Sequence, residues 1–425
     1  MASGPLAGIR VLEFTQIIAG PVGCQHLADM GAEVIKVEPP EGEPWRLFSQ
    51  FMPGESKTFQ SLNRGKKSLV LRLQDPEAQD IIHRLIPSMD VVVSNYRPDV
   101  PAKLGIDYET VRKLRPDIVY VDNTAWGRQG PWSQRPGYDI VAQAVSGLMA
   151  NEGKIDPNGA PGQITSTAIA DFGTGLAIAW AVCAALFHRE KTGEGQLIET
   201  TLLNTALYFL STGAMDLPAA DALKYQKMER VHALQEQHAS YEEISTAYHA
   251  QTRATRAANI YYRTYETSDG AIAIGALSPT LWAKVRAAFG TDFLGMADPN
   301  YNVQDEAWMA VARAKVAEVE EIVRGKSTAW WIEHLEKNGV PAGPVNFVED
   351  MLADPQSIAN GIPVQVEHPL SGPQTQVGPV LKMSGTPLSV QGPSPILGQH
   401  SFELAQEAGL TADQIADLVA RGILA

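Results

Sequence analysis

Cysteine is scarce in this sequence, with only Cys24 and Cys183 among 425 residues. Both lie in apolar stretches of helical character, so neither a disulfide framework nor a cysteine-ligated metal site is indicated. The first residues also lack the basic segment and apolar core of a secretory signal. These absences favour a reducing compartment, and we expect a cytoplasmic protein.

Positive charge is also in short supply. The chain has 34 Lys and Arg residues against 48 Asp and Glu residues, a formal net charge of −14. This balance argues against a general nucleic-acid surface, so an anionic ligand must meet a local cluster of positive charge. Residues 63–72 contain such a cluster, which fits either a phosphate-binding segment or a solvated basic turn.

Charge is absent altogether from Leu176 to Phe187. This alanine-rich run predicts a helix buried on nearly every side. It is twelve residues long, too short to span a bilayer, and we expect no membrane association. Gly193 and Gly195 should end the helix before a strand at residues 196–202.

A lone carboxylate, Asp171, stands just before this run, which places it near the start of the helix. One interpretation is an N-cap, whose side chain accepts backbone N–H bonds. The other is a nucleophile, because Gly173 and Gly175 would let a ligand approach and the helix dipole would keep the acid ionised. The sequence alone leaves both open.

The first half of the chain reads as a series of βα units. Apolar, β-branched runs predict strands at residues 9–14, 33–38, 68–73, 90–94 and 117–121, with helices at 21–30 and 75–87. The turn after the first strand, residues 15–21, lacks G-x-G-x-x-G, which argues against a dinucleotide-dependent enzyme. We therefore predict an α/β fold with ligands at the carboxyl ends of its strands.

The second half changes character. No glycine and a single proline, Pro218, occur between Gly213 and Gly270, so a mostly helical connection is expected. Strands at 259–267 and 269–274 and a helix at 281–289 indicate a small second domain. His232 and His238 lack the spacing and supporting groups of a metal site, and we predict no bound metal.

Several short motifs carry a family resemblance. They are Leu6-x-Gly8-x-Arg10-Val11-Leu12, Ala19-Gly20-Pro21, residues 27–38 (LADMGAEVIKVE), residues 63–68 (NRGKKS), Asn95-Tyr96-Arg97-Pro98, residues 127–131 (GRQGP), Arg135-Pro136-Gly137-Tyr138-Asp139 and residues 339–345 (GVPAGPV). The chain resembles class III CoA-transferases over nearly its whole length. That family also contains carnitine CoA-transferases, formyl-CoA transferase and α-methylacyl-CoA racemases.

The resemblance implies an architecture. A large Rossmann-like domain would be built from residues 1–205 and 331–425, and residues 206–330 would form a helical linker and a smaller α+β domain. Two subunits of such proteins thread through each other, so the resemblance also implies an interlocked homodimer.

The resemblance also implies a reaction. Asp171 matches the family's nucleophilic aspartate, which carries the acyl group and then CoA while CoA moves from an acyl-CoA to a carboxylic acid. Succinyl-CoA is an expected donor because many members of the family use it. Coenzyme A thioester would be a substrate, and no permanently bound cofactor is expected.

Binding residues follow from the same matching. Gln16 falls where formyl-CoA transferase has a histidine near the thioester, and Tyr138 and Asp139 fall beside the acyl site. The remaining matched positions contact CoA in the family: Leu71, Arg72 and Leu73 near adenine and phosphate, and Asn95, Tyr96, Arg97 and Lys103 near pantetheine or phosphate.

Other activities remain open at this point. Pro39 replaces an arginine of formyl-CoA transferase and the glycine-rich active-site loop is missing, so formyl-CoA and oxalate are not the expected substrates. The family's racemases use a histidine at the position of Tyr138, which favours a transferase. A CoA-binding protein without turnover would have no use for Asp171.

Overall fold

The computed structural model describes residues 4–164 and 167–425, and its chain divides into two compact units. The larger unit comprises Met1–Lys154, Gly162–Asp216 and Leu352–Ala425. The smaller unit comprises Ile155–Pro161 and Leu217–Met351. The domain division expected at residues 205 and 330 stays a prediction.

A parallel six-stranded sheet forms the centre of the larger unit, in the order β5-β2-β1-β6-β7-β8. Its strands are β1 (Arg10–Phe14), β2 (Glu33–Glu38), β5 (Lys66–Val70), β6 (Val91–Ser94), β7 (Val119–Thr124) and β8 (Gln196–Thr201). Taken in chain order these strands follow the 3-2-1-4-5-6 arrangement of the Rossmann fold. The predicted α/β class is confirmed.

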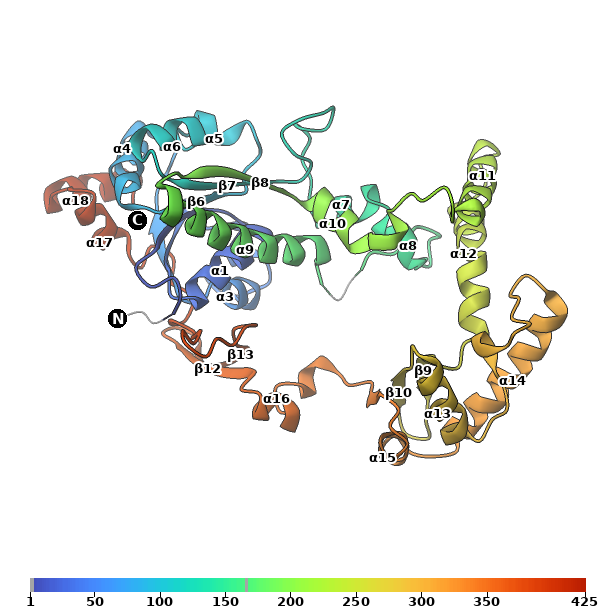
Figure 1. The fold of residues 1–425 in the computed structure, drawn as a ribbon. Coiled ribbons are helices and arrows are strands. Elements are labelled where there is room, and N and C mark those ends of the chain that lie inside the picture. The colour runs from blue at the N-terminus through green and yellow to red at the C-terminus, as the bar shows by residue number, and fades with distance from the viewer. Residues whose placement is uncertain (1–3, 165–166) are drawn as a thin grey trace. The chain divides into compact units, whose positions relative to one another are not determined.

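Successive side chains of each strand point to opposite faces of the sheet, and each face packs into its own hydrophobic core. Val11, Val34 and Val119 pack on one face beneath α1 (Ala19–Asp29) and α9 (Ile169–Thr192). Leu12, Ile35 and Val92 pack on the other, beneath α4 (Pro76–Leu85) and α6 (Tyr108–Leu114), with α17 (Ser401–Glu407) and α18 (Ala412–Ala420) (Figure 1). The C-terminal segment therefore returns to the large domain, as expected.

The helix α9 is longer than the charge-free run that predicted it. It spans 24 residues, and among the described residues it is the one helix long and apolar enough to cross a membrane. Half of the most apolar 18-residue stretch of this helix is buried inside the protein. Its contacts with α1 and the sheet are those of a core helix; the twelve-residue run considered in the sequence is only part of it.

Shorter elements complete the larger unit. They are α2 (Pro44–Leu47), β3 (Gln50–Met52), β4 (Glu55–Ser56), α3 (Lys57–Leu62), α5 (Val100–Lys103), α7 (Asp139–Val145), α8 (Leu148–Glu152), α10 (Leu202–Leu210), α16 (Pro355–Ala359) and the hairpin β12 (Pro363–His368) and β13 (Gly372–Val377). The predicted strand at 68–73 begins two residues earlier and stops at Val70; Leu71 then bridges Leu424.

The smaller unit begins with two helices, α11 (Ala222–Glu236) and α12 (Tyr241–Ala257), as the glycine-free stretch predicted. A three-stranded antiparallel sheet follows, from β9 (Tyr262–Glu266), β10 (Ala271–Gly275) and β11 (Ala342–Pro344). The helices α13 (Pro279–Phe289), α14 (Glu306–Arg324) and α15 (Thr328–Lys337) enclose a core around Trp331 and Phe289. This is the expected small α+β domain.

Candidate active site

The candidate site begins where the strand order of the large sheet reverses. β1 and β6 are neighbours there. Gln16, two residues after β1, and Asn95, the residue after β6, are joined by two hydrogen bonds. The Gln16 N–H donates to Asn95 Oδ1 at 2.9 Å, and Asn95 Nδ2 donates to the Gln16 carbonyl at 2.8 Å. Ligands of open α/β sheets bind at such a reversal, beyond the carboxyl ends of the strands.

A cavity of about 150 Å³ opens at this point. Six of the residues predicted from the sequence line it: Gln16, Asn95, Tyr96, Arg97, Tyr138 and Asp171. They come from the ends of β1 and β6, the start of α7 and the start of α9. The structure thus brings together side chains that lie up to 155 residues apart in the sequence (171 − 16 = 155).

Asp171 lies in the first turn of α9 but does not cap it. The N-cap position is Ala168, which makes no side-chain capping bond. Asp139 takes that role: its Oδ1 accepts the N–H groups of Ala170 at 2.8 Å and of Asp171 at 3.1 Å. The N-cap interpretation of Asp171 was therefore wrong, and its carboxylate is available for another purpose.

Asp139 is itself held in place by Gln143, one turn later on α7. Gln143 Nε2 donates to Asp139 Oδ2, and Gln143 Oε1 accepts the Ile164 N–H at 3.0 Å. Asp139 is buried and was expected to lie beside the acyl site. Its bonds to the α9 backbone fix the helix start that presents Asp171, and its place beside the acyl site stays a prediction.

The environment of Asp171 disfavours its charged form. The residue is 8% exposed, and burial, followed by the nearby Asp139 carboxylate, raises the pKa of Asp171 to about 7. The backbone N–H of Ala19, at the start of α1, acts in the opposite direction. The sequence predicted that the helix dipole would keep this acid ionised at neutral pH; burial and Asp139 shift its pKa in the direction that favours the protonated form.

The glycines after Asp171 serve helix packing. A Cβ on Gly175 would lie 2.6 Å from Val22 Cγ1 of α1, and a Cβ on Gly173 would lie 2.5 Å from the Phe209 ring of α10. Both positions therefore lie against neighbouring helices. The predicted role of these glycines in admitting a ligand is replaced by close helix contact.

Glu43 supports the turn that carries Gln16. Its Oε2 accepts the Ile17 N–H at 2.8 Å, and its Oε1 lies 3.4 Å from Lys36 Nζ. Ile17 has φ 69°, a left-handed conformation that strains a β-branched residue. A buried carboxylate thus stabilises a strained turn at the rim of the cavity.

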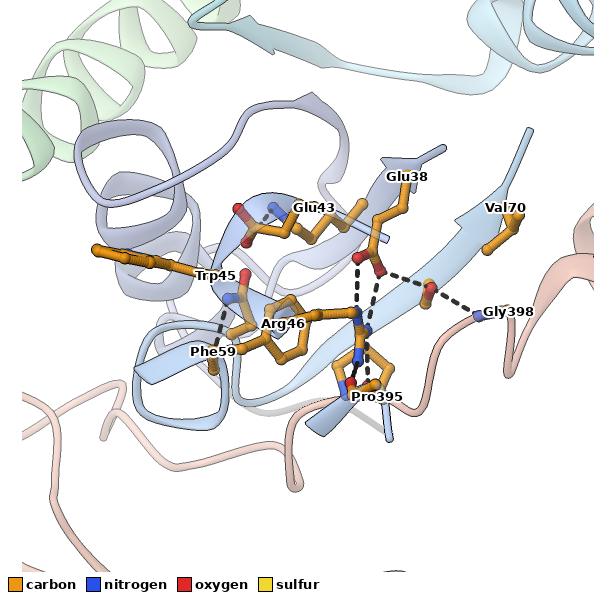
Figure 2. Close-up of polar contacts among 12 residues, drawn as sticks. Glu38, Glu43, Trp45, Arg46, Phe59, Val70, Pro395 and Gly398 are labelled. Carbon is orange, nitrogen blue, oxygen red and sulfur yellow. Dashed lines mark hydrogen bonds and ion pairs between the residues drawn. The ribbon is translucent and has the colours of Figure 1, made fainter. Parts of the chain in front are cut away.

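A second buried pair lies next to Glu43, as Figure 2 shows. Arg46 Nε donates to Glu38 Oε2 at 2.7 Å, and Arg46 Nη2 donates to the Pro395 carbonyl at 2.9 Å. Ser68 Oγ donates to Glu38 and accepts the Gly398 N–H at 3.0 Å. These bonds join the C-terminal segment to α2, β2 and β5.

The basic segment 63–72 is largely neutralised within the fold. Arg64 pairs with the buried Asp29 at 2.7 Å, and Lys66 pairs with the buried Glu13 at 2.9 Å. Lys67 binds Glu33 at 2.7 Å and Glu403 at 2.8 Å. The expected phosphate-binding charge cluster is therefore committed to internal ion pairs, apart from the exposed Arg72.

The other predicted CoA contacts lie outside the cavity. Leu71 and Leu73 are buried in the core, so only their backbone atoms could meet an adenine ring. Arg72 is exposed, and its Nη1 reaches the Arg421 carbonyl at 3.5 Å. Lys103 is exposed and pairs with Asp99 at 2.7 Å. Their assignments to CoA stay predictions.

Sequence reasoning missed several lining residues: Ile17, Asn123, Thr124, Arg135 and Leu202. Asn123 and Thr124 end β7, so the rule that ligands gather at strand ends would have found them. Arg135 belongs to a motif that the sequence displays, but nothing in the motif indicates which way the side chain points. No group of three or more His, Cys, Asp or Glu that could hold a metal ion occurs among the described residues.

Comparison with known proteins gives a consistent result. The family model for CoA-transferase family III matches residues 6–401. Succinyl-CoA:glutarate CoA-transferase of Homo sapiens is 33% identical, over 99% of this chain and 90% of that protein. Succinate–glutarate CoA-transferase of Agrobacterium fabrum is 33% identical, over 95% of both.

A third relative and a solved structure extend the match. The succinyl-CoA–L-malate CoA-transferase beta subunit of Chloroflexus aurantiacus is 31% identical over 99% of this chain and 98% of that protein. The crystal structure of a CAIB/BAIF family protein from Brucella suis superposes with a TM-score of 0.74 and 28% identity, covering 96% of this chain and all of that one. The chain belongs to CoA-transferase family III and is an acyl-CoA:carboxylate CoA-transferase.

Proposed function

We propose that Asp171 is the nucleophile of a transferase that moves CoA from succinyl-CoA to a second carboxylic acid such as glutarate. This proposal rests on one observation. The Asp171 carboxylate is buried, does not cap α9, and lines a small cavity where the strand order of the sheet reverses. The choice of acids follows the printed activities of the relatives from Homo sapiens and Agrobacterium fabrum.

The chemistry proceeds through two covalent states. An Asp171 oxygen attacks the thioester carbonyl, the C–S bond breaks, and CoA leaves as a thiolate. The acyl group stays on Asp171 as a mixed anhydride. The thiolate then attacks the Asp171 carbonyl carbon, which releases the first acid as its carboxylate and leaves an aspartyl-CoA thioester. The incoming carboxylate repeats these steps in reverse, so no net proton, electron or water is consumed.

The same cavity suggests roles for its other predicted residues. Gln16 and Tyr138 would lie beside the reacting thioester, because they line the cavity together with Asp171. Asn95, Tyr96 and Arg97 would contact the pantetheine arm, with Lys103 nearer a phosphate. Arg97 and Lys103 share Asp99, at 3.5 Å and 2.7 Å, which groups the two cations on one edge.

A homodimer is the second part of the proposal. Phe172, Leu176, Trp180 and Phe187 recur along one side of α9, and each is at least 38% exposed. Beside them a largely apolar cavity of about 760 Å³ is lined by Phe51, Phe172 and Leu176. Exposed apolar surface of this extent marks an interaction site, and a second copy of the chain would cover it.

A donor and acceptor panel tests the proposed reaction. Purified protein with succinyl-CoA and glutarate should yield glutaryl-CoA and succinate. Liquid chromatography with mass spectrometry detects both products. Deuterium should not enter the α-position of a 2-methylacyl-CoA in heavy water, since no racemase base is proposed. Rapid α-exchange without an acceptor acid, or no transfer to any acid in the panel, would contradict the proposal.

A further inference from the structure

Two arginines line the cavity that contains Asp171, and they differ in their partners. Arg97 Nε lies 3.5 Å from Asp99, so part of its charge is already balanced. Arg135 is exposed and makes no ion pair or side-chain hydrogen bond to any other residue that the structure describes. A cation left unbalanced in the same cavity as a buried carboxylate is a binding group for an anion.

Aromatic contacts hold this guanidinium in one place. Its Cζ lies 4.4 Å from the ring centre of Trp132, which packs edge-on against Trp126 at 5.1 Å. Trp126 Nε1 donates to the Pro136 carbonyl at 3.4 Å, and the Arg135 N–H donates to the Trp132 carbonyl at 2.8 Å. Stacking occupies a face of the guanidinium and leaves its edge donors free for a carboxylate.

The size of the cavity limits what that anion can be. Pockets for drug-sized ligands have volumes of about 300 to 1,000 Å³. A cavity of about 150 Å³ admits a short acyl group and excludes a nucleotide. An anion that meets Arg135 inside this space, while its other end reacts at Asp171, is therefore the far carboxylate of a short dicarboxylic acid.

We propose that Arg135, stacked on Trp132, binds the distal carboxylate of the acyl group and so selects dicarboxylic over monocarboxylic acids. This assignment rests on the proposed function, in which Asp171 reacts with the other end of the same acid. Arg135 is thus a specificity-determining residue. It belongs to the motif Arg135-Pro136-Gly137-Tyr138-Asp139, from which the sequence assigned it no role.

The test compares two acceptors of equal length, glutarate and pentanoate, with the full-length enzyme. In a ping-pong reaction kcat/KM for the acceptor depends only on the second half-reaction, so the donor does not affect the comparison. Arg135→Ala should lower kcat/KM for glutarate by about 10- to 100-fold, the effect of a lost charge-assisted pair, and leave pentanoate unchanged. Arg135→Lys should recover part of the loss, and Arg84→Ala, an exposed arginine on α4, should change neither value.

Four results would overturn the assignment. An equal loss with both acceptors would assign Arg135 to CoA binding or to loop structure. No loss with glutarate, or a wild-type enzyme without preference for glutarate, would remove its role in selection. Absence of transfer by the wild type to either acid would overturn the proposed function and this assignment with it, whereas an active wild type and an inactive Asp171→Ala variant would leave the proposed function standing.

Discussion

The acidity of Asp171 links its burial to the rate of the reaction. A nucleophilic carboxylate must be ionised, and the pKa of this group in the free enzyme is raised to about 7. We predict that kcat/KM rises with pH and levels off above about pH 8, with an apparent pKa near 7. A pH profile of kcat/KM, with a donor that does not titrate in this range, checks this prediction. A flat profile between about pH 5 and pH 8 would refute the link between the burial of Asp171 and the rate.

The same shift predicts how stability depends on pH. The folded pKa of Asp171 lies above its ordinary value of 3.8, so the folded state holds the proton more tightly than the unfolded state. The free energy of unfolding of the wild type should therefore fall, relative to that of Asp171→Asn, as pH rises from about 4 through about 7. The variant should be more stable by about 2 to 4 kcal/mol above that range.

Urea denaturation at about pH 4 and pH 8 measures this difference directly. The gap between wild type and Asp171→Asn should be small at the lower pH and large at the higher one. A gap that stays constant, or that narrows with pH, would mean that Asp171 is not buried as described.

Glu43 offers a separate prediction about the strained turn at Ile17. Glu43→Ala removes the acceptor of the Ile17 N–H and a counter-charge of the buried Lys36, so unfolding should become easier by about 2 to 4 kcal/mol. Because Gln16 then loses its position, kcat should fall more than the donor KM rises. Glu43→Gln should restore part of both, and Glu41→Ala, at an exposed glutamate two residues earlier, should change neither.

At the scale of single residues, the sequence indicates which residue is the candidate nucleophile but not which groups surround it. Asp171 could be found because an uncharged run follows it. Its raised pKa could not, because the pKa depends first on burial, which the fold decides, and then on Asp139, which lies 32 positions earlier (171 − 139 = 32) and begins α7. For the same reason the charges of Arg64 and Lys66 appeared free in the sequence, since their partners Asp29 and Glu13 belong to distant elements.

The contact between α1 and α9 can be tested as an element. A Cβ at Gly175 would stand 2.6 Å from Val22 Cγ1 and 3.0 Å from the Ala19 carbonyl oxygen, so Gly175→Ala forces the two helices apart. We expect a loss of about 1 to 3 kcal/mol in the free energy of unfolding. The matched control is Gly213→Ala, where no neighbouring atom lies within 4 Å of the new Cβ and stability should be unchanged or slightly raised.

Elements were predictable where a single pattern controls them. The central strands of the large sheet are apolar and mostly buried on both faces, so β1, β2 and β6 could be predicted closely. The hairpin of β12 and β13 was missed because its strands, such as PVQVEH, carry mostly polar and half-exposed residues. α9 begins earlier than its apolar run because Asp139 caps it from another helix.

At the scale of the whole molecule, the apolar side of α9 predicts association. Trp180→Asp should weaken the proposed homodimer and shift it toward monomer, because it places a charge in an interface that would exclude water. Light scattering coupled to size-exclusion chromatography reads the mass. Leu114→Asp, on α6 across the sheet, should keep the wild-type mass; a wild-type enzyme that is active as a monomer would refute the proposal.

The central claim is that Asp171 carries the acyl group and then CoA. Full-length enzyme should be incubated with succinyl-CoA and hydroxylamine, digested and mapped by peptide mass spectrometry. The account predicts a hydroxamate at Asp171 alone, none in Asp171→Asn, and a complete loss of transfer in that folded variant. A hydroxamate at another residue, or near-normal transfer by Asp171→Asn, would contradict it.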